Sequence, residues 1–93
     1  MKQENININI KFFGPLKKYS KYKKLDAILV KPGCTVSEFK NTLLGIITNL
    51  EQNSNARSLI MSSAIADDTR VYQNEDKLLK NISLLVLPPV CGG

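Results

Sequence analysis

The sequence ISLLVLPPVCGG, residues Ile82–Gly93, joins an apolar run to two prolines and a Gly-Gly end. The first six residues, Ile82–Leu87, have the length of a strand, and their nearly unbroken apolar character predicts burial on both faces in the middle of a sheet. The two prolines fix φ and keep the residue before each of them extended, so they would end the strand and stiffen the start of the tail. The sequence therefore predicts a folded domain over residues 1–87 and a tail over residues 88–93.

The end of the chain suggests a chemical role for the carboxylate of Gly93. Glycine has no Cβ, so a Gly-Gly tip can lie against another protein and pass through a narrow channel to an active site. The residues that would thread through such a channel are Gly92, Cys91, Val90, Pro89 and Pro88. A carboxylate accepts a sulfur nucleophile only after activation, for example as an acyl-adenylate formed on the α-phosphate of ATP. The alternative is a frayed end without a function, because chain termini are often poorly ordered.

The strongest helix signal lies in the middle of the chain. Thr35 is a favourable N-cap, and Glu38 follows it at the spacing of a capping box. Apolar residues then recur at helical spacing on one face, so a helix is predicted over residues 36–50. Its core face consists of Val36, Phe39, Leu43, Ile46, Ile47 and Leu50. Gly45 lies within this helix, and close packing on a sheet would account for it.

Two strands are predicted before this helix. Residues 5–12, NININIKF, alternate between polar and apolar, which is the period of a half-buried strand. The core positions are Ile6, Ile8, Ile10 and Phe12. Residues 25–31 form the second predicted strand, and a short helical turn over residues 16–22 fits the connector. Two strands joined in this way favour an antiparallel pair.

After the helix, residues 51–57 are polar and predict a loop. Residues 58–66 predict a strand, and a turn over residues 67–69 leads to a short partner strand over residues 70–73. Two residues of the next polar stretch are expected to anchor it in the core, namely Leu78 and Leu79. The order of the elements fits one α+β domain, in which one main helix packs on a mixed sheet of about five strands.

The composition is that of a soluble globular protein, with 43% apolar and 23% charged residues among 93. No apolar stretch approaches the ~20 residues that span a bilayer, and no signal-peptide core follows the start, so we expect a cytoplasmic protein without a membrane partner. Cys34 and Cys91 fit no metal spacing, and reduced thiols are expected. The chain has no histidine and no Gly-rich phosphate loop, which argues against an enzyme with its own catalytic site or a bound cofactor.

Three stretches of the sequence are similar to one known family. Residues 10–16, IKFFGPL, are similar to an opening strand with paired aromatics, and residues 32–39, PGCTVSEF, to an entry from strand to helix. Residues 86–93, VLPPVCGG, are similar to a Pro-Pro-Val-x-Gly-Gly end. With the order of the elements, these stretches resemble the MoaD/ThiS-type sulfur carriers, and the MoaD branch most closely. The resemblance implies the ubiquitin-like β-grasp fold.

In that family a ubiquitin-activating-type enzyme uses ATP to adenylate the terminal glycine, and a sulfurtransferase route then converts it to a thiocarboxylate. In the MoaD branch the tail inserts into the larger subunit of molybdopterin synthase and donates sulfur to a pterin precursor. The resemblance therefore implies that Gly93 carries the reacting carbonyl and that Gly92 occupies the narrow passage. It implies no cofactor bound to this chain, since the partner enzyme uses the ATP.

The resemblance also implies a docking surface, because Phe13 and Leu87 match positions that form an apolar surface for both partners. Independently, Phe13 is a large aromatic residue out of phase with the core face of its strand, and exposed apolar patches often mark interaction sites. Packing of Phe13 under the Leu16 turn is the alternative. Arg70 stands where an apolar residue is common and would alter the docking surface. The family's Gly-Asp turn before the last strand is missing, and Cys91 fills a slot usually held by a small residue.

Other functions stay open on the sequence alone. The sulfur could serve thiazole, tRNA-thiolation or cysteine synthesis, and a protein modifier could be joined to lysines through Gly93. A nucleic-acid-binding module is a further alternative, because seven of the thirteen basic residues precede position 25 and tyrosines interleave the lysines of residues 17–24. For this basic run we favour a solvated connector, and steering toward an acidic partner is a third interpretation.

Overall fold

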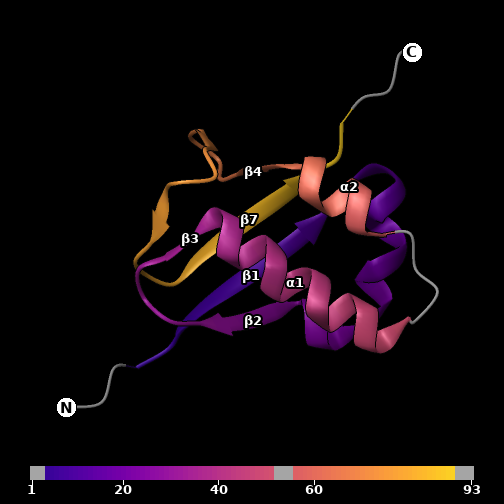
Figure 1. The fold of residues 1–93 in the computed structure, drawn as a ribbon, viewed down its shortest axis with the longest axis horizontal. Helices are drawn as coiled ribbons and strands as arrows, with labels where there is room; N and C mark the ends of the chain where they lie inside the picture. Colours follow the sequence, from indigo (N-terminus) through magenta and orange to yellow (C-terminus); the bar gives the residue numbers. More distant parts are fainter. Residues whose placement is uncertain (1–3, 52–55, 90–93) are drawn as a thin grey trace.

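The computed structural model describes residues 4–51 and 56–89. Their centre is a five-stranded sheet with the strand order β2-β1-β7-β4-β5. The strands are β1 (Ile6–Phe12), β2 (Ala27–Val30), β4 (Ala64–Ala66), β5 (Val71–Tyr72) and β7 (Ile82–Leu87). One long helix, α1 (Val36–Leu50), lies across one face of the sheet (Figure 1). No helix within the described ranges is long and apolar enough to cross a membrane.

The last strand occupies the middle of the sheet, as its apolar sequence predicts. β7 pairs in parallel with β1, and the register places Ile8 opposite Ile82 and Phe12 opposite Val86. On its other side β7 pairs with β4 in an antiparallel ladder. β2 pairs with the free side of β1, which confirms the predicted antiparallel pair. The sheet is therefore mixed, with its two longest strands side by side and parallel at the centre.

The prediction that the last strand is buried on both faces is wrong. Leu84 and Val86 are fully buried, whereas Ser83 is exposed and Leu85 and Leu87 are half buried on the opposite face. The reason is that α1 covers only one face of β7, so alternate side chains differ in burial. The face of the sheet that α1 does not cover therefore carries apolar side chains that are partly exposed to solvent.

The main helix begins and ends where the sequence predicts. The Glu38 N–H donates to the Thr35 hydroxyl oxygen at 3.1 Å, and the Thr35 N–H donates to the Glu38 carboxylate at 2.8 Å, so the capping box is formed. Its core face is fully buried at Val36, Phe39, Leu43 and Ile47, and Leu44 is buried as well. The other two predicted core residues, Ile46 and Leu50, are only partly buried at the rim of the core.

The connector between the first two strands forms two 3₁₀ helices, η1 (Gly14–Lys21) and η2 (Lys23–Leu25). This confirms the predicted helical turn. Tyr19 is buried, and its ring meets the ring of Phe12 edge-on at a centroid distance of 6.1 Å. The second strand begins at Ala27 rather than at the predicted Leu25, because Leu25 is buried as the last residue of η2.

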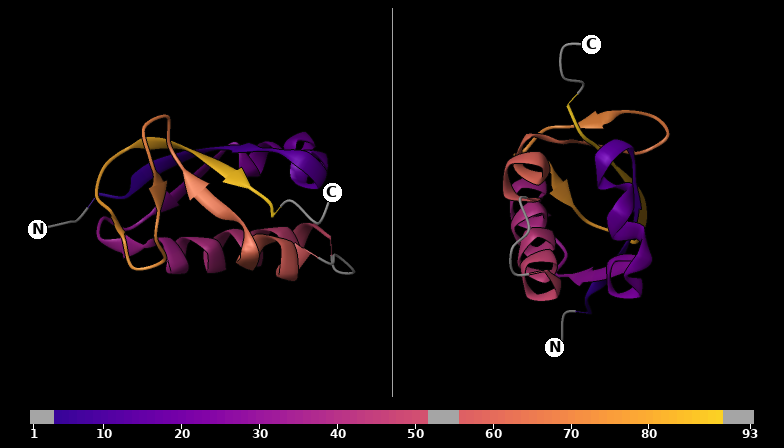
Figure 2. Two further views of the ribbon diagram at one scale, coloured as in Figure 1. Left: turned by 90° about the horizontal axis from the view of Figure 1, so that it is seen from above. Right: turned by 90° about the vertical axis from the view of Figure 1, so that its right-hand side faces the viewer.

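Residues 58–66 do not form one strand. They contain most of a short helix, α2 (Ala56–Ser62), followed by the short strand β4. The Ser62 hydroxyl donates to the Ser58 carbonyl oxygen at 2.6 Å within this helix. A short apolar run has no period that separates a buried helix from a buried strand, which explains the wrong prediction. α2 packs beside α1 (Figure 2), and its first two residues belong to the segment for which the sequence predicts a loop.

A second, two-stranded sheet is not predicted by the sequence. It pairs β3 (Cys34–Thr35) with β6 (Lys77–Leu78) in an antiparallel ladder. Leu78 is buried and anchors this segment as expected, but Leu79 is 68% exposed, so the prediction for Leu79 is wrong. Leu79 directly follows β6, and successive side chains of an extended chain point to opposite sides, so only one of the two leucines reaches the core.

Lys40 links α1 to two other segments through neutral acceptors. Its side chain is buried, and its ammonium group donates to the Met61 carbonyl oxygen and to Asn74 Oδ1, each at 3.3 Å. Burial lowers the pKa of this ammonium group because it disfavours the charged form. The lysine thereby ties the last turn of α2 and the loop after β5 to the main helix.

Gly45 is exposed on α1, and a Cβ built there meets no atom within 4 Å. The predicted close packing at Gly45 is therefore wrong. Replacing Gly45→Ala should raise the free energy of unfolding by about 0.5–1 kcal/mol, since alanine has the higher helix propensity. Urea unfolding followed by circular dichroism would measure the change, and a decrease in stability would contradict the described surroundings of Gly45.

Candidate functional site

An apolar cleft lies where the chain leaves the last strand. Its volume is about 530 Å³, and it is lined by Phe13, Gly14, Pro15, Leu59, Leu87, Pro88 and Pro89. We call it the tail-base cleft. Pro88 is half buried in it and Pro89 is exposed. The predicted threading residues Val90, Cys91 and Gly92 and the predicted reacting residue Gly93 lie outside the described residues.

The parallel pairing of β1 and β7 brings the two predicted docking residues together. Phe12 lies opposite Val86 in the register, so Phe13, directly after β1, and Leu87, the last residue of β7, lie at the same end of the sheet. Both side chains are half buried and line the tail-base cleft. Whether a partner binds there is not tested by the structure, so the docking role stays a prediction.

Gly14 lets the base of the tail approach the turn after β1. Its φ is +58°, in the left-handed region that residues with a Cβ rarely adopt. A Cβ built on Gly14 would also lie 3.1 Å from Cγ of Pro88, which is tighter than an ordinary contact. Both the turn and the close packing of Pro88 therefore depend on a residue without a side chain.

Sequence reasoning missed three of the residues that line the cleft. In the sequence, Gly14 and Pro15 stand out only within residues 10–16, which carry the family resemblance, although the turn that they form makes one wall of the cleft. Leu59 is predicted in a strand, whereas it lies on α2 and reaches the cleft from that helix. The Gly-Pro pair directly after the paired aromatics is the available signal for the first two, but no sequence signal places Leu59.

None of the described residues that line the tail-base cleft has an ionisable side chain. Lys11 lies beside this lining, with its ammonium group 5.8 Å from the centroid of the Phe13 ring. A cation over an aromatic face is weakly attracted to it, so Lys11 adds a positive charge near the rim. Such a cleft can hold apolar side chains of another protein, but the described part of its lining supplies no group for acid–base chemistry.

Arg70 does not line the tail-base cleft. It precedes β5 at the edge of the sheet, and β4 separates β5 from β7. Its guanidinium group stacks on the Tyr72 ring at 4.1 Å from the centroid and lies 3.7 Å from the Asp76 carboxylate. It is exposed, and its predicted effect on partner docking is not tested by the structure.

Asp67 fixes the turn that presents Arg70. Its carboxylate accepts hydrogen bonds from the Tyr72 hydroxyl at 2.6 Å and from the N–H groups of Thr69 and Arg70 at 2.8 and 2.9 Å. The bond from Tyr72, followed by those from Thr69, holds the pKa of Asp67 well below its ordinary value. This turn agrees with the prediction for residues 67–69.

Cys34 and the lysines of residues 17–24 do not line the tail-base cleft. Cys34 is a half-buried free thiol on β3, and burial raises its pKa, so it is mainly protonated near neutral pH. The lysines of residues 17–24 lie on η1 and η2, where Lys21 is 3.9 Å from the Glu51 carboxylate. Tyr19 is buried, so its ring is not available to stack on a base. The interpretation of this run as a solvated connector stays a prediction.

The comparisons with known proteins show the fold. No family model and no curated protein matches the sequence. Among solved structures, SAMP1 from Haloferax volcanii superposes with a TM-score of 0.63 at 19% identity, covering 94% of this chain and 99% of that one. The UBL domain of Plasmodium falciparum Dsk2 gives a TM-score of 0.54 at 12% identity, covering 91% and 99%. The chain therefore has the ubiquitin-like β-grasp fold, which confirms the predicted α+β class.

Replacing Gly14→Ala should lower the free energy of unfolding by about 1–3 kcal/mol, because the methyl group strains a left-handed backbone and presses on Pro88. The matched variant, Gly45→Ala, makes the same chemical change at an exposed helical site and should move stability in the opposite direction. Urea unfolding of both variants would measure this. Equal effects at the two glycines would contradict the role of Gly14.

Proposed function

We propose that this protein is a ubiquitin-like carrier whose C-terminal glycine, Gly93, is activated by a partner enzyme. One observation carries the proposal: the strand at the centre of the sheet runs directly into Pro88 and Pro89, beside an apolar cleft formed by Phe13, Leu59 and Leu87. This geometry anchors the start of the tail in the most strongly paired part of the domain. It also provides a surface next to the tail that a partner can bind.

The proposed chemistry takes place entirely at the Gly93 carboxylate. A carboxylate oxygen attacks the α-phosphorus of ATP, the bond to pyrophosphate breaks, and an acyl-adenylate forms. A sulfur nucleophile then attacks the acyl carbon, and AMP leaves with the electrons of the C–O bond. With hydrosulfide as the donor, the products are the thiocarboxylate, AMP and one proton. The partner enzyme supplies the catalytic groups, and this chain supplies the substrate end.

Within this class we propose a sulfur carrier for molybdopterin synthesis, acting as the small subunit of the synthase. The support is the resemblance of residues 10–16, 32–39 and 86–93 to the MoaD branch. Its partners would be a ubiquitin-activating-type adenylating enzyme, a sulfurtransferase and the larger synthase subunit. The tail-base cleft would be the docking surface for the adenylating enzyme and the larger subunit in turn. A cytoplasmic location follows from these partners.

A protein modifier is the second candidate function. The observation that favours it is the structural similarity to SAMP1, a ubiquitin-like small archaeal modifier protein. A modifier and a sulfur carrier share the acyl-adenylate and differ in the nucleophile, which is a lysine amine in the first and sulfur in the second. The same geometry at the base of the tail serves both.

The test is mass spectrometry of the full chain after incubation with ATP, an adenylating enzyme of this class and sodium sulfide. A carrier should gain the mass difference between sulfur and oxygen at its C-terminus, and a variant lacking Gly92 and Gly93 should not. A modifier should instead give isopeptide adducts on lysines when target proteins are added. If neither product forms with an enzyme that is active on its own carrier, the proposal is wrong.

Docking through the tail-base cleft predicts a second result. Replacing Phe13→Asp should raise the KM for adenylation about tenfold or more with little change in kcat, because a charge would be buried against the partner away from the reacting carboxylate. Leu79→Asp is the matched control, since Leu79 is 68% exposed and does not line the cleft. An equal KM for both variants, each shown to be folded by its thermal melt, would contradict the docking role.

A further inference from the structure

β2 is an edge strand whose outer side is free within the described part of the chain. The Ile10 N–H donates to the Asp26 carbonyl oxygen at 3.0 Å, and these two residues lie opposite each other in the β1–β2 register. Bonded and non-bonded pairs alternate in an antiparallel ladder, so Ala27 and Leu29 belong to non-bonded pairs. Their N–H and C=O groups therefore point away from β1 and are available to a further strand.

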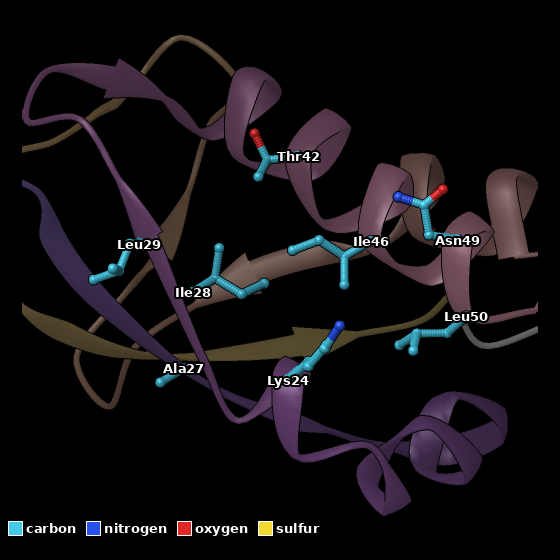
Figure 3. A pocket seen from close by; sticks show the side chains of 8 residues that line it. All are labelled: Lys24, Ala27, Ile28, Leu29, Thr42, Ile46, Asn49 and Leu50. Carbon is cyan, nitrogen blue, oxygen red and sulfur yellow. The ribbon is translucent and has the colours of Figure 1, made fainter.

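A groove runs between this free edge and α1, and we call it the edge groove (Figure 3). Its volume is about 510 Å³, and its apolar part is formed by Ile28 of β2 and by Ile46 and Leu50 of α1. Thr42 and Asn49 lie along the helical rim. Among the residues that the structure describes, the groove and the tail-base cleft have no lining residue in common.

The dimensions of the edge groove fit an extended segment. The four residues of β2 span about 13 Å at the rise of a strand, and the helical rim from Thr42 to Leu50 spans about 12 Å at the rise of an α-helix. Both walls thus match about four residues of an added strand. Alternate side chains of that strand would enter the groove toward Ile46 and Leu50, and the others would lie beside Leu29, which is 62% exposed.

The positive charges around the edge groove favour an acidic occupant. Lys24 is the one ionisable residue among the described residues that line it, and its ammonium group reaches toward Leu50 and Ile46 at one end (Figure 3). Lys23 and Lys31 flank β2 and outnumber the exposed Asp26. A second copy of this chain, with a net charge of +5, would bring like charges together on pairing through β2.

We propose that the edge groove binds an extended, acidic and apolar segment of a partner protein, which adds to β2 as a sixth strand of the sheet. Main-chain hydrogen bonds to Ala27 and Leu29 would hold the segment, as in other cases of strand addition. Two apolar side chains fill the groove, and a carboxylate next to them pairs with Lys24. The site is separate from the activation of Gly93 and stays open when the tail-base cleft is occupied.

Two synthetic peptides test the proposal, STITVTDEE and EEDTITVTS, which place the acidic group at either end of the same apolar core. Titration into the ¹⁵N-labelled full chain should give saturable shifts confined to residues 24–31 and 42–50 for at least one of them. A peptide with lysines in place of the acidic residues should bind at least about fivefold more weakly. No saturation up to millimolar peptide, or shifts centred on Phe13 and Leu87, would overturn the proposal.

Two pairs of variants separate the contacts. Leu29→Pro removes the outward N–H while leaving the ladder to β1 intact, and should weaken binding about tenfold, whereas Leu29→Ala keeps that N–H and should weaken it less. Lys24→Glu should weaken binding of the acidic peptide about five- to tenfold, and Lys17→Glu, which changes the net charge equally on η1, should have an effect below about twofold.

If Leu29→Pro does not fold, Lys24→Glu and Lys17→Glu still test the proposal, because both change exposed residues only. Equal binding by Lys24→Glu and Lys17→Glu would overturn the proposal. So would a concentration-dependent dimer in sedimentation whose interface shifts map to β2, since a second copy would then be the occupant. Loss of peptide binding without loss of Gly93 adenylation is the expected pattern, and it distinguishes this site from the tail.

Discussion

The parallel pairing of β1 with β7 is the constraint on which the rest of the structure depends. It joins the first and last strands of the domain, so the chain cannot form its central ladder until residues far apart in sequence meet. Because parallel strands end at the same edge, this pairing also places Phe13 next to Leu87 and directs Pro88 against Gly14. The tail-base cleft is thus a consequence of the topology at the centre of the sheet.

Much of the fold could be predicted because several segments carry one unambiguous period. Residues 5–12 alternate strictly, and the capping box at Thr35 fixes the start of α1, so both elements lie where the sequence places them. Short apolar runs carry less information. The apolar pattern of residues 58–66 fits a strand as well as a helix, although most of these residues form α2. The two-residue strands β3 and β6 have too few positions to show any period.

The candidate site was predictable in part, and for different reasons. Phe13 and Leu87 could be paired because one is out of phase with its strand and both follow from the family resemblance. Leu59 could not be found, since its place in the cleft depends on how α2 packs against the sheet. The edge groove could not be found either, because it is formed by the spacing between β2 and α1 rather than by a sequence motif.

The attachment of the tail to β7 has a mechanical consequence. A partner that binds the end of the chain and exerts force on it would pull β7 along its own axis, between β1 on one side and β4 on the other. Force in that direction loads the hydrogen bonds of both ladders at once. A strand that is pulled sideways from the edge of a sheet would instead lose its hydrogen bonds one after another. The domain should therefore resist tension that is applied to its tail.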